Sequence, residues 1–548
     1  MSSLTWFRHR SLSSAAIVAV ILAAYGLSMW GGSLGCFVFD QSIIFDGAWR
    51  ILCGQIPFKD FISPVGPVPF YMQAAFFKVF GITHFAYRIH AAIINAVVSG
   101  LVMLYLSWIL PGRRWLWVMA GLLTAIWYYA PLGTPWYSQT SVFFGVLGLG
   151  FVLSTRYFKN PFLLRSRWAQ VVGPAFWAAP CMVLSFLTKQ NSGAMFLLMP
   201  LILFWIPPRK SDPWVNTAAY IFGLLVSVAA VAGSIHYFAS FELFWNHMFA
   251  LPWSTLFVRL AYKKYISKTM LFHVPFTLLV LSFLFWKIIR KIKHIQYSDT
   301  GFLAFLFFGG FLFHLGMITT STSDAFINIP FIGILFALAF QMIDQWALQS
   351  APDQNTRKWL WIRSSQMALV VLFCGLGISM IASYRLKGHE AGQRLLPPIA
   401  SGPLKGLRWN EPSSMITLKN LQDILQFMQA TREPVYLTNG FTMLYGMTGH
   451  QSIDPFLWYH QGLSFPDSYS AEMESLDRQT LQRIIKLNPK YMVFAQYSLD
   501  NPQVGYLAYF RQVRNYFYEN YAFASADMGP YLILYQRKNE NPVIDKSF

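Results

Sequence analysis

Residues 40–66, DQSIIFDGAWRILCGQIPFKDFISPVG, hold three aspartates directly after an apolar segment long enough to cross a membrane. The first 384 residues contain only six further acidic residues, Asp212, Glu242, Asp299, Asp324, Asp344 and Asp353. A third of the acidic residues of this region therefore lies in one short stretch. Because ionisable groups near lipid are costly and usually serve function, this cluster indicates chemistry at the membrane surface.

The composition is that of a multi-pass membrane protein. Of the 548 residues, 55% are hydrophobic and 12% are charged, whereas soluble domains have about 25% charged residues. The net charge of +19 comes from Lys and Arg clusters between apolar runs, which is typical of the positive-inside bias and not of nucleic-acid binding. We therefore expect the lipid bilayer, and no nucleic acid, among the partners.

Eleven apolar runs predict about eleven transmembrane helices of roughly 20 residues each. They lie at 13–31, 85–109, 115–132, 138–155, 170–188, 192–207, 215–237, 270–287, 302–320, 325–344 and 361–384. Six basic clusters, beginning at Arg8, Arg113, Arg156, Arg209, Lys287 and Arg357, all fall on one side of this arrangement, which the positive-inside rule assigns to the cytoplasm. The N-terminus, an uncleaved first helix, is then cytoplasmic. The loop 32–84 and everything after about residue 385 are extracytoplasmic, in the inner or plasma membrane of the cell.

Two short helices are expected in the first outer loop, at 41–53 and at 67–80, both along the membrane surface. The tail, 385–548, holds the other fourteen of the 23 acidic residues. It alternates helices at 417–430, 474–486 and 505–518 with strands at 434–438, 491–497 and 531–537. This order predicts a small α/β domain with a mainly parallel sheet. The predicted fold class is an α-helical polytopic membrane protein, domain 1–384, with a small extracytoplasmic α/β domain, 385–548.

The first loop also carries a spaced motif, D-x6-G-A-W-R-x3-G-x2-P-x2-D-F-x4-G-P, which begins at Asp40 and ends at Pro67. K-V-F-G at 78–81 and Arg88, at the start of the second transmembrane run, continue it. This pattern resembles the GT-C membrane glycosyltransferases. The resemblance is to the branch related to protein O-mannosyltransferases (glycosyltransferase family 39) and to the aminoarabinose transferases that modify lipid A. The helix bundle by its topology, and the tail segment 441–465, FTMLYGMTGHQSIDPFLWYHQGLSF, resemble that branch loosely.

The resemblance implies transfer of a hexose or pentose from a polyprenyl-phosphate-linked sugar donor to an acceptor on the outer face of the membrane. The acceptor, a glycolipid, polysaccharide or protein of the envelope, is not identified. The family's catalytic base matches Asp40, whose carboxylate suits removal of the acceptor's proton as it attacks the anomeric carbon. Lys or Arg near the bilayer surface suits the developing charge of the leaving phosphate. The alternative role for Asp40 is a helix N-cap.

The other charged residues of the loop each have two interpretations. Asp46 lies inside the expected helix, where a solvated face or a salt bridge to Arg50 at i+4 is favoured over catalysis. Asp60 is either a contact for donor or acceptor, or a turn residue. Arg88 is either a phosphate contact or an arginine that extends its charged end to the membrane interface.

Two further positions are weaker candidates for substrate binding. Lys189, in LTKQNSG (187–193), resembles T-K-Q runs of the family and is placed to reach the carrier phosphate, or to extend to the interface. Asp324, in TSTSDAFIN (319–328), has Thr322 and Asn328 where relatives often have Arg and His, which argues against a role. No cofactor is implied. Neither the histidines nor the cysteines have metal-ligand spacing and the first loop has no D-x-D, so we expect no metal site.

Three other functions fit a polytopic chain of this kind. A transporter or flippase of lipid-linked glycans would place ionisable groups at the bilayer midplane or show repeated halves, and the acidic residues here fall in loops or at helix ends. A polymerase or ligase of surface polysaccharide would concentrate its chemistry in a late loop. A non-enzymatic envelope protein whose tail binds partners also remains open.

Overall fold

The computed structural model describes residues 3–35, 38–63, 65–157, 173–205, 211–254, 337, 340, 341, 344, 356–385, 397–408, 418–437, 441–457, 469–495, 509–525 and 532–538. The chain divides into two compact units. The helical unit comprises residues 1–32, 88–232 and 257–385, and the loop–tail unit comprises residues 33–87, 233–256 and 386–548. We describe each unit by itself.

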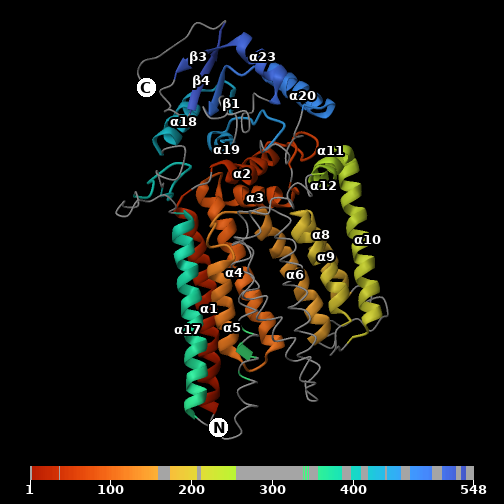
Figure 1. Ribbon diagram of the computed structural model, residues 1–548, viewed down its shortest axis with the longest axis vertical. Helices are drawn as coiled ribbons and strands as arrows, with labels where there is room; N and C mark the ends of the chain where they lie inside the picture. Colours follow the sequence, from red (N-terminus) through yellow and green to blue (C-terminus); the bar gives the residue numbers. More distant parts are fainter. Residues whose placement is uncertain are drawn as a thin grey trace. The chain divides into compact units, whose positions relative to one another are not determined.

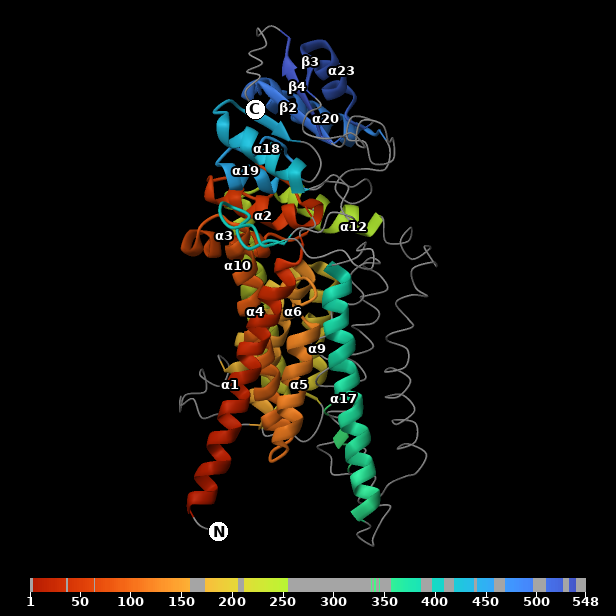
Figure 2. The same cartoon turned by 90° about the vertical axis from the view of Figure 1, so that its left-hand side faces the viewer.

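The helical unit consists of long apolar helices that run side by side (Figures 1 and 2). Most of α1, α4 and α10 belongs to it, together with five complete helices. The bounds are α1 (Ser3–Ser33), α4 (His84–Ile109), α5 (Arg114–Trp127), α6 (Tyr137–Tyr157), α8 (Pro174–Phe186), α9 (Gln190–Leu203), α10 (Pro213–Phe238) and α17 (Thr356–Arg385). Helices α6, α8 and α9 pack against one another, and α17 packs against α5.

Five stretches among the described residues are long and apolar enough to cross a membrane. They are Ser14–Ser33, His84–Ile109, Tyr137–Tyr157, Pro213–Phe238 and Leu360–Ser379, and α5, α8 and α9 are shorter apolar helices. Eight of the eleven predicted runs therefore contain a helix. The other three, at 270–287, 302–320 and 325–344, lie outside the described residues except for positions 337, 340, 341 and 344.

Close backbone contact and one buried amide hold the start of the helical unit together. The Asn95 side chain donates to the carbonyls of Ala24 (2.8 Å) and Ala125 (2.9 Å), and so joins α1, α4 and α5. Gly32, near the end of α1, lies against Gly133, which has a φ of 61°. A Cβ added at Gly32 would lie 2.2 Å from the Gly133 carbonyl oxygen, so α1 can approach this turn only as glycine.

The loop–tail unit contains the first loop and most of the described tail. Its helices are α2 (Val38–Leu52), α3 (Val68–Phe80), α11 (Phe241–Trp245), η1 (Asn246–Ala250), α12 (Leu251–Ser254), α18 (Leu418–Ala430), α19 (Met443–Thr448), α20 (Ala471–Leu487) and α23 (Arg511–Asn520). Helices α2 and α3 confirm the two short helices predicted in the first loop. Helix α3 has Pro67 at its N-cap and Pro69 in its first turn, and its C-cap is Gly81, whose φ of 82° favours glycine.

The sheet of this unit has four strands in the order β1-β2-β4-β3. Its strands are β1 (Val435–Leu437), β2 (Tyr491–Ala495), β3 (Tyr521–Ser525) and β4 (Leu532–Arg537). Only β1 and β2 are parallel, and β4 is antiparallel to both β2 and β3. The prediction of a mainly parallel sheet was therefore wrong. The unpredicted strand β3 ends too close to β4 for the crossover of a dozen residues that a parallel pair needs.

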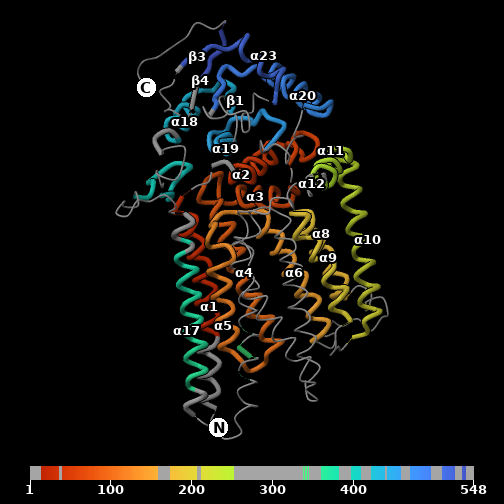
Figure 3. Tube along the Cα trace, viewed as in Figure 1, coloured from red at the N-terminus to blue at the C-terminus, as the bar shows by residue number. Residues whose placement is uncertain are grey.

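The first loop contributes to the core that covers this sheet. Ile62 lies in a buried cluster with Tyr436, Phe456, Phe494 and Phe517. The Ile62 amide donates to the Pro455 carbonyl at 2.7 Å, and the Leu457 amide donates to the Ile62 carbonyl at 3.4 Å. The chain trace in Figure 3 shows α2 beside α19, about 400 residues later in the sequence. The first loop and the tail are therefore packed as one body.

Candidate functional site

The proposed base, Asp40, lies in the first turn of α2 and its side chain is half-buried. The helix begins at Val38, two residues before Asp40, so the carboxylate is within the helix and does not precede it as an N-cap. The neighbouring residues are tied to two other segments. The Tyr87 hydroxyl donates to the Gln41 carbonyl at 3.0 Å, and the Met443 amide donates to the Ser42 hydroxyl at 3.2 Å.

Asp46 and Arg50 form the salt bridge that their i,i+4 spacing predicts. Arg50 Nε donates to Asp46 Oδ2 at 2.9 Å, and both side chains are completely buried, so the alternative of a solvated face was wrong. These two side chains are buried because residues 442–457 of the tail, about 400 positions later in the sequence, cover this face of α2. Burial raises the pKa of Asp46, while the Arg50 guanidinium and the Ser452 hydroxyl both lower it.

Three tail residues complete this buried group. The Ser452 hydroxyl donates to Asp46 Oδ1 at 2.5 Å. Arg50 Nη1 donates to the main-chain carbonyl of Asp454, and the Tyr436 hydroxyl donates to Asp454 Oδ1 at 2.5 Å. We call these five residues, Asp46, Arg50, Tyr436, Ser452 and Asp454, the Arg50 cluster. Only Asp46 and Arg50 were considered from the sequence. For Ser452 and Asp454 the sole sequence signal was the loose resemblance of segment 441–465, and Tyr436 lies in the strand predicted at 434–438.

The glycines and aromatic residues of the loop motif also have structural roles. A Cβ at Gly47 would lie 2.6 Å from the Phe70 ring. The absence of a side chain at Gly47 therefore allows α2 to pack closely on α3. The Trp49 indole donates to the His450 carbonyl at 2.8 Å. The Phe61 ring lies under the Arg50 guanidinium, 5.5 Å from ring centre to charge. Much of the motif therefore shapes α2 and its contacts with α3 and the tail.

Asp60 closes the turn that follows α2. Its Oδ2 accepts the Ile56 amide at 2.8 Å, and the Asp60 amide donates back to the Ile56 carbonyl at 2.9 Å. The Arg483 guanidinium donates to the Asp60 carbonyl. These contacts give Asp60 the turn role that was one of its two interpretations.

Arg88 and Lys189 belong to the helical unit. Arg88 is 5% exposed, and its Nη1 donates to the Met29 carbonyl at 3.3 Å. Lys189 occupies the N-cap position of α9, and its ammonium donates to the Ser138 hydroxyl at 2.7 Å near the start of α6. The ammonium also lies 5.9 Å from the centre of the Tyr137 ring. Lys189 thus lies where two helices begin, a place that favours an anion.

The predicted site residues are therefore divided between the two units. Asp40 and Asp60 lie in the loop–tail unit, and Arg88 and Lys189 lie in the helical unit. Asp324 lies outside the described residues. Among the residues that the structure does describe, no group of three or more His, Cys, Asp and Glu side chains is placed to hold a metal ion.

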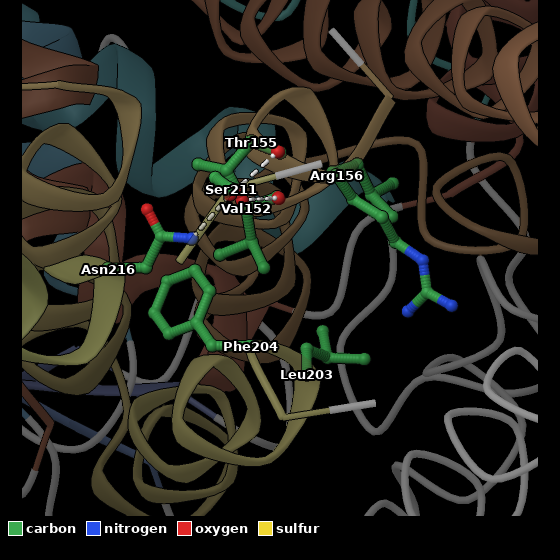
Figure 4. A pocket seen from close by; sticks show the side chains of 8 residues that line it. Val152, Thr155, Arg156, Leu203, Phe204, Ser211 and Asn216 are labelled. Carbon is green, nitrogen blue, oxygen red and sulfur yellow. Dashed lines mark hydrogen bonds between the residues drawn. The ribbon is translucent and has the colours of Figure 1, made fainter. Parts of the chain in front are cut away.

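A small cavity with both polar and apolar lining lies at the other end of α6 and α9 from Lys189. Its lining includes Thr155, Arg156, Phe204, Ser211 and Asn216 (Figure 4). The Asn216 amide donates to the Ser211 hydroxyl at 2.7 Å, and that hydroxyl donates to the Thr155 carbonyl at 2.9 Å. Because 21 residues of helix are about 30 Å long, this cavity lies far from Lys189 and is not part of the proposed donor site.

Comparison with known proteins decides the fold. No family model and no curated protein matches the sequence. Among solved structures, ArnT from Cupriavidus metallidurans bound to undecaprenyl phosphate matches 97% of this chain and 98% of its own, with a TM-score of 0.51 and 13% identity. The apo oligosaccharyltransferase of Archaeoglobus fulgidus matches 93% of this chain and 73% of its own, with a TM-score of 0.51 and 11% identity. The chain has the GT-C fold.

The GT-C fold confirms the predicted fold class in its main feature, a helical membrane protein built on the plan of the membrane glycosyltransferases. At 11–13% identity the likeness extends to the fold alone.

Proposed function

We propose that this GT-C chain is a glycosyltransferase that moves a hexose or pentose from a polyprenyl-phosphate carrier to an envelope acceptor at the outer face of the membrane. The observation that carries this proposal is the fold, shared over 97% of the chain with ArnT, whose structure holds undecaprenyl phosphate. The acidic first loop of this chain and its motif support the same function.

In the proposed reaction Asp40 takes the proton of the acceptor hydroxyl or amine. The freed electron pair attacks the anomeric carbon of the donor sugar, and the bond from that carbon to the phosphate oxygen breaks. Polyprenyl phosphate leaves with the bonding electrons. Its developing negative charge requires cations, for which we propose Lys189 and Arg88. Asp60 and Asp324 are the remaining proposed substrate contacts.

The proposed orientation follows the distribution of Lys and Arg. We propose eleven transmembrane helices, a cytoplasmic N-terminus in the inner or plasma membrane, and an extracytoplasmic α/β domain at 385–548. The first loop and the tail pack as one body in the loop–tail unit, which supports placing both on the same side. A topology reporter fused after residue 390 is expected to report the outer side of the membrane. A cytoplasmic signal from that fusion would contradict the orientation.

Replacing Lys189 by methionine is expected to weaken binding of undecaprenyl phosphate about tenfold, because one charge-assisted contact to the phosphate is lost. Native mass spectrometry of the solubilised protein with added undecaprenyl phosphate measures the bound fraction. Lys486→Met, at an exposed lysine of α20 outside the motif, is the matched control and should leave binding unchanged. Undecaprenol, which lacks the phosphate, should bind both variants equally. Equal retention of the phosphate lipid by Lys189→Met and the parent protein would remove Lys189 from the donor site.

A further inference from the structure

The Arg50 cluster is a buried group of charged and polar side chains, and its stabilising effect alone does not explain its geometry. Asp46, Arg50, Tyr436 and Asp454 are completely buried, and Ser452 is 4% exposed. Moving such charges out of water costs free energy that their mutual attraction only partly recovers. Apolar residues of similar size in place of the charged ones would stabilise the folded unit equally well. The benefit of the charged group is that its directional bonds allow one arrangement of α2 on the tail.

The hydrogen bonds of the Arg50 cluster join α2 to the tail segment that follows α19. Asp46 and Arg50 are on α2, whereas Ser452 and Asp454 follow α19 in the tail. Arg50 uses Nε for Asp46 and Nη1 for the Asp454 carbonyl, so the planar guanidinium fixes both at once. Asp46 in turn uses one oxygen for Arg50 and the other for Ser452. Rotation or sliding of α2 would break several of these bonds together.

Packing around the cluster has the same consequence. A Cβ at Gly446 of α19 would lie 3.1 Å from both Phe45 and Trp49, so α19 already lies in tight contact with α2. Ser42 accepts the Met443 amide one helical turn away from this contact. The tail therefore holds α2 at its first turn, along its middle and near its C-terminal end.

We propose that the Arg50 cluster positions Asp40, which makes the tail segment 442–457 a working part of the active loop and Arg50, Asp46, Ser452 and Asp454 positioning residues. Naming the group that is positioned rests on the proposed function. Asp40 precedes Arg50 by ten residues on one rigid helix, about 15 Å at 1.5 Å per residue. A small rotation at the cluster therefore displaces the Asp40 carboxylate, and misplacement by about 1 Å costs roughly 100-fold in rate.

The test compares Arg50→Gln, Asp46→Asn and the double variant in the full-length protein. Each single change leaves a buried group without its partner, and the double change replaces the ion pair by a neutral amide pair. The singles are expected to lower kcat for sugar transfer roughly 100-fold with an unchanged KM for donor. They are also expected to raise amide hydrogen exchange in peptides 38–52 and 443–457 by on the order of tenfold. The double variant should recover much of both losses.

Asp477→Asn is the matched control, because it makes the same chemical change at another completely buried aspartate of the loop–tail unit. Asp477 accepts the amides of Gln512 (2.8 Å) and Val513 (3.1 Å) at the start of α23 and the Tyr469 hydroxyl at 3.2 Å. Its replacement should raise exchange in α20 and α23 while kcat and α2 stay as in the parent. Tyr436→Phe, which removes only one hydroxyl bond of the cluster, gives a milder variant if Arg50→Gln does not fold.

Each outcome decides the proposal. A parent-like kcat in Arg50→Gln would overturn it, whatever the exchange shows, and so would parent-like exchange at 38–52 in both Arg50→Gln and Tyr436→Phe. Equal losses of kcat in Asp477→Asn would overturn it too, because any damage to the tail would then suffice. If the parent protein transfers no sugar at all, the proposed function fails on its own. The exchange comparison would then still decide whether the cluster holds the first turn of α2 in place.

Discussion

Replacing Asp40 by asparagine is expected to abolish sugar transfer, with a loss of about 10²–10⁴-fold in kcat, the range that general-base catalysis contributes. Asparagine keeps the shape of the side chain but cannot accept the acceptor's proton. Asp40 is half-buried in the first turn of α2, so the substitution should leave expression and membrane insertion normal. The measurement is transfer of labelled sugar from polyprenyl-phosphate donors in proteoliposomes.

The matched control for this result is Asp212→Asn. Asp212 is an exposed aspartate outside the first loop, and its Oδ1 accepts the Trp214 amide at 2.8 Å at the start of α10. Asparagine can accept that bond equally well, so transfer should remain at the parent level. Full activity in Asp40→Asn would remove Asp40 as the base. Loss of activity in both variants would show that the assay responds to any lost carboxylate.

Gly32→Ala is expected to cause the largest loss of stability, about 3 kcal/mol or more, because the new Cβ would meet backbone that cannot move aside. The nearest atoms are the Gly133 carbonyl oxygen at 2.2 Å and Arg88 Cγ at 2.9 Å. The measurement is the thermal midpoint of the protein in detergent, together with the yield of monodisperse material.

Gly26→Ala in the same helix is the matched control for this prediction. Apart from the adjacent residues and backbone of its own helix, no atom lies within 4 Å of the Cβ position at Gly26. Alanine is favoured over glycine inside a helix by about 0.5–1 kcal/mol, so this variant should be unchanged or slightly more stable. A Gly32→Ala protein as stable as Gly26→Ala would contradict the close approach of α1 to Gly133.

The secondary structure of the described residues was largely predictable because it depends on local signals. The apolar runs gave the long helices, and the prolines on either side of Val68 and the glycine at 81 gave both ends of α3. Strand β3 was missed because Asn520 ends α23 and Tyr521 begins the strand, with no Gly, Pro or polar cluster between them. Because β3 was missed, the sheet was predicted to be mainly parallel, whereas β4 is antiparallel to both β2 and β3.

The environment of the site could be predicted only in part. The spacing of Asp46 and Arg50 was enough to predict their ion pair, because both are on one helix turn. Their burial was not predictable, since it depends on Ser452 and Asp454, more than 400 positions away. The motif residues Gly47 and Trp49 suggested function, whereas their contacts with Phe70 and His450 are structural. A spaced motif does not separate residues that react from residues that hold the reacting helix.

The most direct measurement of the central claim is a mass-spectrometric comparison of envelope glycans and polyprenyl-phosphate sugars. The compared cells carry the parent protein, the Asp40→Asn variant or no protein. If the chain is the proposed glycosyltransferase, one sugar is absent from one envelope glycan, lipid or protein in the last two strains. Its polyprenyl-phosphate donor accumulates there at the same time. Identical glycans and identical donor pools in all three strains would contradict the proposal.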